Sequence, residues 1–147
     1  MPEGPLLRVF LDADVLIAGS ASTTGAAHVI LQLGELKVIQ AISSAQARDE
    51  AERNLAAKLP DALAPFRALA DAACTWVPDP PPRRRAGLRG KAHPKDVPIL
   101  AAAVEARCAF LVTFNVRDFR PGDLLAVENP GAFLDRLRSH LEALGLP

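Results

Sequence analysis

The feature that most constrains this chain is a pair of short apolar runs, each followed directly by polar or acidic residues. Residues 7–12 have the pattern of a strand that ends at Asp12, and residues 109–114 have that of a strand just before Asn115. Helical patterns separate the predicted strands, and such alternation favours a parallel sheet covered on both faces. We therefore expect an α/β fold, a three-layer α/β/α sandwich with a central, mainly parallel sheet.

The other elements are predicted from hydrophobic periodicity and from residues that cap helices. Ser43 or Ser44 is expected to cap the helix after the second strand, and Asp61 the helix after that. A basic loop is expected over residues 80–95, and a loop with a short edge strand over residues 115–130. Further strands are expected over residues 37–43 and 74–78, and helices over residues 23–36, 45–59, 61–73, 93–108 and 130–144.

Length and composition indicate one globular domain, residues 1–147, in which 50% of the residues are hydrophobic. Cys74 and Cys108 match no metal or redox spacing, so both are expected to be small core residues. The start of the chain lacks a secretory pattern, and no apolar run reaches the length of a membrane span. A cytoplasmic protein with no membrane partner is therefore expected.

The charge is balanced overall but uneven along the chain. Lys plus Arg equals Asp plus Glu, 17 each, so there is no global positive field. Residues 80–95 nevertheless contain four Arg, two Lys and one His without any acid. The net charge therefore conceals a local basic segment.

Acidic and amide side chains are predicted to converge at the carboxyl edge of the sheet, where open parallel α/β sheets place their binding sites. Asp12 and Asn115 follow predicted strands. Asp96 opens the helix before the strand at 109–114, and Glu50 lies about two turns into the helix after the second strand. The topology thus permits all four side chains to face one crevice.

Two carboxylates in the first motif suggest a cation. If Asp12 and Asp14 lie on the same side of a strand end, they are about 6–7 Å apart and repel each other. A divalent cation would turn that repulsion into attraction. Because the surrounding candidates offer oxygen ligands without His or Cys, Mg²⁺ or Mn²⁺ suits them better than Zn²⁺.

Each of these residues also has a purely structural interpretation. Asp12 and Asp96 can be caps or turn residues, and Asp14 a structural hydrogen-bonding residue. Glu50 lies among other charges, as on a solvated helix face, and Thr113 suits a strand on propensity alone. The joint order of the residues, and no single one of them, favours a functional site.

That order resembles the PIN domain family, the nuclease fold that includes the VapC-type toxins of bacterial toxin/antitoxin pairs. Four segments carry the resemblance and together span nearly the whole chain. The third is the most specific, because an acid at a helix start, an Ala-rich helix and an apolar strand ending in Thr-x-Asn occur together. The segments are VFLDADVLIAG (9–19), SSAQARDEAERNLAAKLP (43–60), HPKDVPILAAAVEARCAFLVTFNVRDF (93–119) and ENPGAFLDRL (128–137).

The resemblance implies that acids at fixed places bind a metal ion. It makes Asp12 the first of these acids, Glu50 the second and Asp96 the third. The fourth place is held by Asn115 or Asp118, because family members have Asp at the former place, or Asn there followed by Asp three residues on. If Asp118 does not reach the site, one anionic ligand is missing.

Two further residues of the motifs have implied roles. Asp14 departs from the Asn or Ser that is commoner at its place, and we hypothesise that its carboxylate compensates for the neutral Asn115. Thr113 is implied to position the ligands or the scissile phosphate.

The activity implied by the resemblance is metal-dependent hydrolysis of RNA, with Mg²⁺ or Mn²⁺, leaving a 5′-phosphate and a 3′-hydroxyl. An antitoxin as protein partner and a homodimer are consistent with the family. Aromatic residues make up only 5% of the chain, so sequence-specific reading of RNA is not expected. The candidates for phosphate contacts are Arg83, Arg84, Arg85, Arg89, Lys91 and Lys95.

Two alternatives remain open from the sequence. The stretch VFLDADVLI also resembles the first motif of haloacid-dehalogenase-like phosphatases, in which Asp12 would be the nucleophile and Asp14 the acid/base. That reading leaves Glu50 and Asp96 unexplained. The other alternative is a degenerate PIN-like module that binds RNA or a protein without cutting. The neutral Asn115 leaves this alternative open, because one anionic metal ligand is missing if Asp118 does not reach the site.

Overall fold

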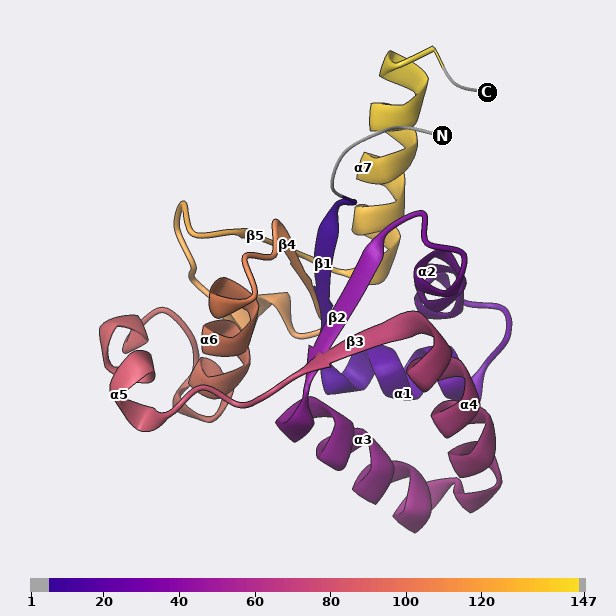
Figure 1. The fold of residues 1–147 in the computed structure, drawn as a ribbon, viewed down its shortest axis with the longest axis horizontal. Helices are drawn as coiled ribbons and strands as arrows, with labels where there is room; N and C mark the ends of the chain where they lie inside the picture. Colours follow the sequence, from indigo (N-terminus) through magenta and orange to yellow (C-terminus); the bar gives the residue numbers. More distant parts are fainter. Residues whose placement is uncertain (1–5, 146–147) are drawn as a thin grey trace.

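A computed structural model describes residues 6–145 of the chain, and its centre is a five-stranded sheet (Figure 1). The strand order is β3-β2-β1-β4-β5, and every neighbouring pair is parallel. This confirms the predicted parallel sheet. The strands are β1 (Arg8–Leu11), β2 (Gln40–Ser44), β3 (Cys74–Val77), β4 (Phe110–Val112) and β5 (Ala126–Glu128).

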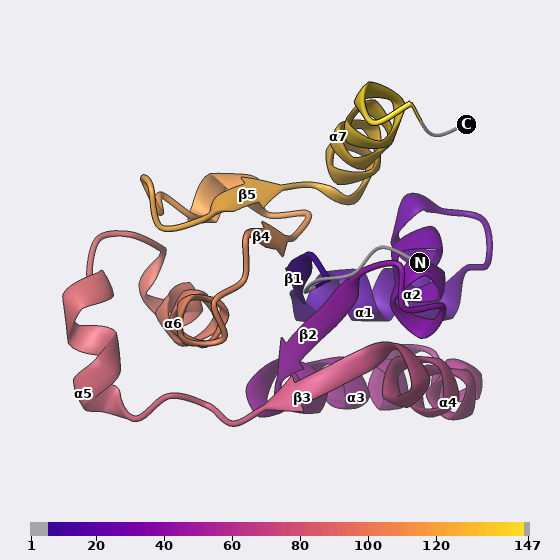
Figure 2. The same cartoon turned by 45° about the horizontal axis from the view of Figure 1, so that its top comes forward.

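Helices cover both faces of the sheet. Figure 2 shows α5 and α6 on one side and α1, α2, α4 and α7 on the other, which confirms the three-layer α/β/α arrangement. Short 3-10 turns precede α4 and α6 and follow α5. The helices are α1 (Ala13–Ala21), α2 (Ala26–Glu35), α3 (Ala45–Lys58), α4 (Leu63–Ala73), α5 (Pro82–Arg85), α6 (Val97–Glu105) and α7 (Pro130–Ala143).

The central strand β1 is apolar on both faces because helices pack on both of its sides. Val9, Phe10 and Leu11 are fully buried. The two cysteines are free thiols, with Cys108 buried and Cys74 half-buried. This confirms their interpretation as core residues.

The helix α1 was not predicted, and it changes the geometry expected for the two acids. Asp12 is the N-cap of α1, and Asp14 lies in the first helical turn. The assumption that both acids lie on one side of a strand end is therefore wrong. The apolar run Val15–Ile17 looks like a continued strand in the sequence, but the capping aspartate starts a helix there.

Capping was predicted correctly at one helix and wrongly at another. Ser44 caps α3 by accepting a hydrogen bond from the amide of Ala47, while Ser43 donates to the carbonyl of Leu11. Asp61 caps no helix, because it lies in the 3-10 turn Pro60–Ala62 that precedes α4. Proline at the start of that turn moves the start of α4 past Asp61.

Two other segments differ from expectation. The basic segment, expected to be a loop, forms the short helix α5 and a 3-10 turn over Ala86–Leu88. The strand expected over 109–114 is only Phe110–Val112, so Thr113 and Phe114 lie beyond its end. Among residues 6–145 no single helix is long and apolar enough to span a membrane, and only α1 and α2 together, bent by 96°, match in length and composition.

Close packing between α2, β2 and α4 depends on Gly34, and we predict that Gly34→Ala destabilises the fold. An added Cβ would lie 2.9 Å from the Cβ of Ala41 and 2.9 Å from the carbonyl oxygen of Ala73. Overpacking of this kind lowers the free energy of unfolding by about 1–3 kcal/mol. Urea denaturation measures it, with Gly87→Ala as control because nothing lies within 4 Å of that position. Equal stability of the two variants would contradict the packing.

Candidate active site

The candidate site lies at the carboxyl edge of the two central strands, β1 and β4. Their pairing ends with Leu11 opposite Val112, and the amide of Asp12 donates to the carbonyl of Val112 at 3.1 Å. The next side chains, Asp12 and Thr113, therefore meet, and the Thr113 hydroxyl donates to Oδ2 of Asp12 at 3.0 Å. The other carboxylate oxygen of Asp12 accepts from the amide of Ala13 at 2.8 Å, which starts α1.

Asp14 is bound by the segment that follows β4. Its Oδ2 lies 3.0 Å from the amide nitrogen of Phe114, 3.1 Å from Nδ2 of Asn115 and 3.3 Å from the Thr113 hydroxyl. Its Oδ1 is buried and has no hydrogen-bond partner. A buried, unpartnered carboxylate oxygen is unfavourable unless a cation or proton reaches it.

Burial and nearby negative charges disfavour the charged forms of both acids. Asp12 is only 7% exposed, and burial, together with the charges of Asp14 and Asp96, raises its pKa from 3.8 to about 7. Burial also raises the pKa of Asp14, and the charge of Glu50 adds to the effect. Asp96 and Glu50 thus act electrostatically on the pair, although neither contacts it by a hydrogen bond.

A second acidic pair is held together by a lysine. Nζ of Lys95 lies 3.0 Å from Oδ2 of Asp96 and 3.5 Å from Oδ2 of Asp118. The hydrogen bond to Asp96 is the main reason why the pKa of Lys95 is raised. The carboxylate of Asp96 is therefore paired with an ammonium group, whereas that of Asp12 forms no ion pair with any residue between 6 and 145.

The structure divides the predicted ligands into groups rather than one cluster. Asp12, Asp14, Thr113 and Asn115 are in hydrogen-bond contact, and Asp96 and Asp118 share Lys95. Glu50 is exposed on α3. Within residues 6–145, no three His, Cys, Asp or Glu side chains are arranged to hold a metal ion.

Asn115 contacts the two neighbouring site residues through its nitrogen atoms. Its side-chain amide nitrogen donates to Asp14, and its backbone amide donates to the Thr113 hydroxyl at 3.1 Å. In this conformation it orients Asp14. The idea that Asp14 and Asn115 belong to the same site agrees with this contact, and whether either binds a metal stays a prediction.

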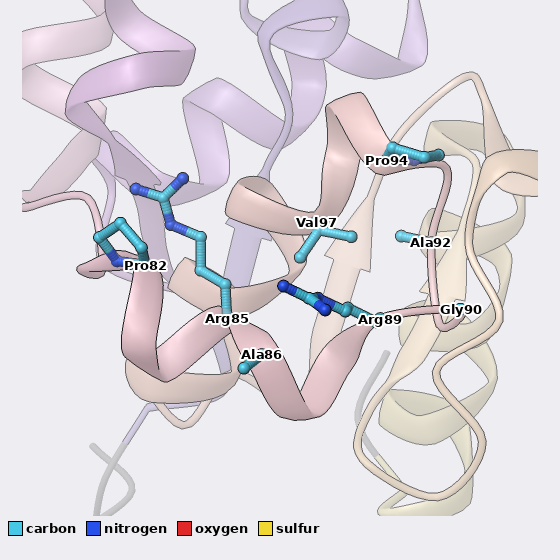
Figure 3. Close-up of a pocket in the computed structure, with 8 residues that line it drawn as sticks. All are labelled: Pro82, Arg85, Ala86, Arg89, Gly90, Ala92, Pro94 and Val97. Atoms are coloured by element: carbon cyan, nitrogen blue, oxygen red, sulfur yellow. The ribbon is translucent and has the colours of Figure 1, made fainter.

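The basic segment lies beside the start of α6. Arg85 and Arg89 line a pocket of about 480 Å³ together with Val97, the residue after Asp96 (Figure 3). Arg85 donates to the carbonyl of Pro80 at 2.8 Å. Arg89 is exposed and its side chain points toward Val97 (Figure 3).

The six predicted phosphate-contact residues are not equivalent. Arg84 forms an ion pair with Glu105 at 2.8 Å, and Lys95 is engaged with two acids. Arg83 and Arg89 are exposed, and neither forms an ion pair with any residue in the described range 6–145. Lys91 is half-buried and its backbone carbonyl accepts from Arg120.

Sequence reasoning missed Phe114. It placed this residue inside a strand, whereas the side chain is 53% exposed and the amide binds Asp14. The signal was present as a large aromatic residue between two polar residues at a strand end.

Comparisons with known proteins give the family and the fold. The PIN domain family matches residues 8–117, which is most of the chain. The chain belongs to the PIN domain family. The match includes Asp12, Glu50, Asp96 and Asn115 and ends one residue before Asp118. It decides between the two families that the first motif resembles, in favour of the PIN domain, whose members are generally nucleases that use divalent metal ions.

A solved structure shows the same fold. A chain of the crystal structure of VapBC2 from Rickettsia felis, bound to a DNA fragment from the promoter, superposes with a TM-score of 0.64 at 16% sequence identity. The alignment covers 84% of this PIN domain protein and 98% of the other chain. No curated protein matches the sequence.

The raised pKa values give a pH prediction for the metal-free protein. Because Asp12 binds its proton more tightly in the folded state, its contribution to stability is present below about pH 4 and is lost as the pH rises through about 7. The largest slope for one group is about 1.4 kcal/mol per pH unit. Asp12→Asn removes this contribution.

The measurement is chemical denaturation of both proteins with chelator, from pH 4 to pH 8. The difference in unfolding free energy between Asp12→Asn and wild type should grow in favour of the variant as the pH rises. A difference that stays constant across this range would show that folding does not raise the pKa of Asp12.

Proposed function

We propose that this PIN domain is a metal-dependent endoribonuclease and the toxin of a toxin/antitoxin pair. The observation that carries the proposal is the pair of a buried Asp12 and a half-buried Asp14 at the carboxyl edge, within the region that matches the family. Burial of two like charges side by side is unfavourable for folding, so their position is better explained by a cation that binds there.

The donor set fits Mg²⁺ or Mn²⁺. The unpartnered Oδ1 of Asp14 and the carboxylate of Asp12 offer hard oxygen ligands, and no thiol or imidazole is involved. Asp96 would join them after it exchanges Lys95 for the ion. Glu50 and Asp118 remain candidates that contribute through water. A bound divalent ion would lower the pKa of a water molecule and neutralise charge on the phosphate.

The surrounding residues have defined tasks in this proposal. Thr113 and the amide of Phe114 hold Asp12 and Asp14 in place, so that the two carboxylates are oriented before the ion binds. Lys95, an exposed cation beside Asp96 and Asp118, would contact a phosphate. Arg83, Arg85 and Arg89 would hold the RNA backbone on the side of α6.

The proposed partner is an antitoxin protein encoded next to this gene, and the proposed location is the cytoplasm. The chain shares its fold with a chain of the VapBC2 structure, and we infer the partner from that shared fold. A homodimer is part of the same proposal. The neighbouring gene tests the partner: a small DNA-binding protein is expected there, and its absence would leave a ribonuclease without toxin function.

We predict that Asp12→Asn abolishes metal-dependent cleavage of single-stranded RNA. Loss of outer-shell partners of a metal already lowers activity by about 10–100-fold, so loss of a direct ligand should exceed about 100-fold. Mn²⁺ should raise the melting temperature of the wild type at pH 8 and not that of the variant, because ligand binding stabilises the folded state. Asp61→Asn is the matched control, because Asp61 lies in a distant turn.

The outcomes separate the alternatives. Binding of RNA without cleavage in the presence of Mn²⁺ would favour a degenerate binding module. Hydrolysis of a small phosphomonoester, with phosphate trapped on Asp12, would favour a phosphatase. Cleavage that survives both chelator and Asp12→Asn would contradict the proposed site.

We also predict that Arg89→Ala weakens RNA binding more than Arg83→Ala. Both substitutions remove one charge from the same segment, but only Arg89 lines the pocket beside the start of α6. Loss of one phosphate contact lowers the salt dependence of binding to a single strand by about 0.7 in slope. Titration of a labelled oligoribonucleotide at several salt concentrations measures this slope, and equal slopes for the two variants would show that the pocket has no special role.

A further inference from the structure

One aromatic side chain is exposed at the edge of the candidate site. Of the six phenylalanines, Phe114 is 53% exposed, whereas Phe10, Phe66 and Phe133 are fully buried. The remaining two also belong to the core region: Phe119 is 6% exposed, and Phe110 packs edge-to-face on Phe133 at 5.2 Å. The sequence therefore uses phenylalanine as a core residue at every position except the one beside the acids.

The backbone that carries this ring is fixed by the site itself. The amide of Phe114 donates to Oδ2 of Asp14 at 3.0 Å. Thr113, on one side, is fully buried and bound to Asp12, and Asn115, on the other side, is bound to Asp14 and Thr113. The ring is thus exposed to solvent on a backbone that is anchored at three successive residues to the two carboxylates.

Within residues 6–145, no other exposed large apolar side chain lies in the segment directly after β4 that carries the ring. The other exposed large apolar side chains lie within α2, before β2, after α3, before β5 and after α7, and none of them follows a strand of the sheet. The immediate neighbours of Phe114 along the chain are polar, and its amide donates to the carboxylate of Asp14. A single ring in polar surroundings suits a ligand that is itself flat, aromatic and attached to charge.

We propose that Phe114 is a stacking site for one unpaired base of the RNA substrate, adjacent to the phosphate that is cut. The proposal rests on the proposed ribonuclease function. A base stacked on this ring would carry its own phosphodiester group toward Asp12 and Asp14, since both acids are bound to the same segment as the ring. A base within a duplex already has both faces stacked, so the site selects single-stranded RNA.

The selectivity expected from one ring is limited and general. Any of the four bases offers a π-face, so Phe114 favours unpaired over paired RNA without reading the sequence. This agrees with the low aromatic content of the chain, which provides one stacking position and no extended platform. Truncation of an aromatic side chain that stacks on a base weakens the affinity by about 5- to 150-fold.

Binding measured without cleavage tests the site. In the presence of chelator, the affinity for a labelled single-stranded oligoribonucleotide is determined by fluorescence anisotropy for the wild type and for Phe114→Trp, Phe114→Leu and Phe114→Ala. We expect Trp to bind at least as tightly as Phe, and Leu and Ala at least about fivefold more weakly. Leu keeps an apolar side chain of similar length, so it separates stacking from hydrophobic contact. Leu36→Ala, an exposed apolar residue before β2, is the control and should not change the affinity.

A direct signal comes from a tryptophan placed at the ring position. Because the chain has a single tryptophan, the double variant Trp76→Phe with Phe114→Trp reports only from position 114. Single-stranded RNA should quench its fluorescence, and the same sequence as a duplex should quench it less. A series of single strands, each with an abasic site at a different position, should locate the stacked base. Circular dichroism verifies that the variants are folded.

The results distinguish this inference from the proposed function. Equal affinity of Phe114→Leu and wild type, or fluorescence that RNA leaves unchanged, would overturn the stacking site. Shielding of position 114 only by the protein encoded next to the gene would also overturn it, in favour of a protein contact. If RNA does not quench the fluorescence at position 114 but the wild type cleaves RNA with metal, this inference alone is refuted. If RNA quenches the fluorescence but the protein never cleaves RNA, the ribonuclease function is refuted and the stacking site stands.

Discussion

The hydrogen bond between Thr113 and Asp12 joins two chain segments that are 101 residues apart, and the arrangement of the site depends on it. It extends the pairing of β1 with β4 by one side-chain contact beyond the last backbone bond, at the edge where both strands end. Asp12 at the same time starts α1, which brings Asp14 back toward the segment after β4. One capping residue therefore brings together a buried carboxylate, that of Asp12, and a half-buried one, that of Asp14.

The structure tolerates this charge in two different ways. At Asp12 and Asp14, backbone amides and one hydroxyl partly compensate for burial, yet Oδ1 of Asp14 is left without a partner and the pKa of Asp12 is raised to about 7. At Asp96 and Asp118, an exposed lysine supplies the positive charge. Residues that break local rules of stability often mark functional sites, and the unpaired acids are such a case. Asp12, Asp14 and Asp96 would hold the ion, and Lys95 would supply a cation for the substrate.

The parallel sheet, and the edge at which its strands end, were predictable from the sequence. Parallel strands end at a common edge, so Asp12 and the residues after the strand at 110–112 were expected at the same edge, and the pairing of β1 with β4 brings them together. The PIN resemblance was confirmed. Helix α1 was not predictable from periodicity, because Val15, Leu16 and Ile17 suit a buried strand equally well. The donor role of the Asn115 amide and the bridge of Lys95 depend on side-chain contacts across the fold, which no spacing in the sequence encodes. The exposure of Phe114 depends on β4 ending at Val112, and strand ends are the least certain part of such predictions.

The most direct test of the account is a crystal structure of the protein with Mn²⁺, in which anomalous scattering locates the ion. The account predicts one peak in contact with carboxylate oxygens of Asp12 and Asp14, with the Asp96 carboxylate turned toward it and away from Lys95. A peak at other residues, or an Asp12–Asp14 pair that stays empty at saturating Mn²⁺ while Lys95 remains on Asp96, would contradict it.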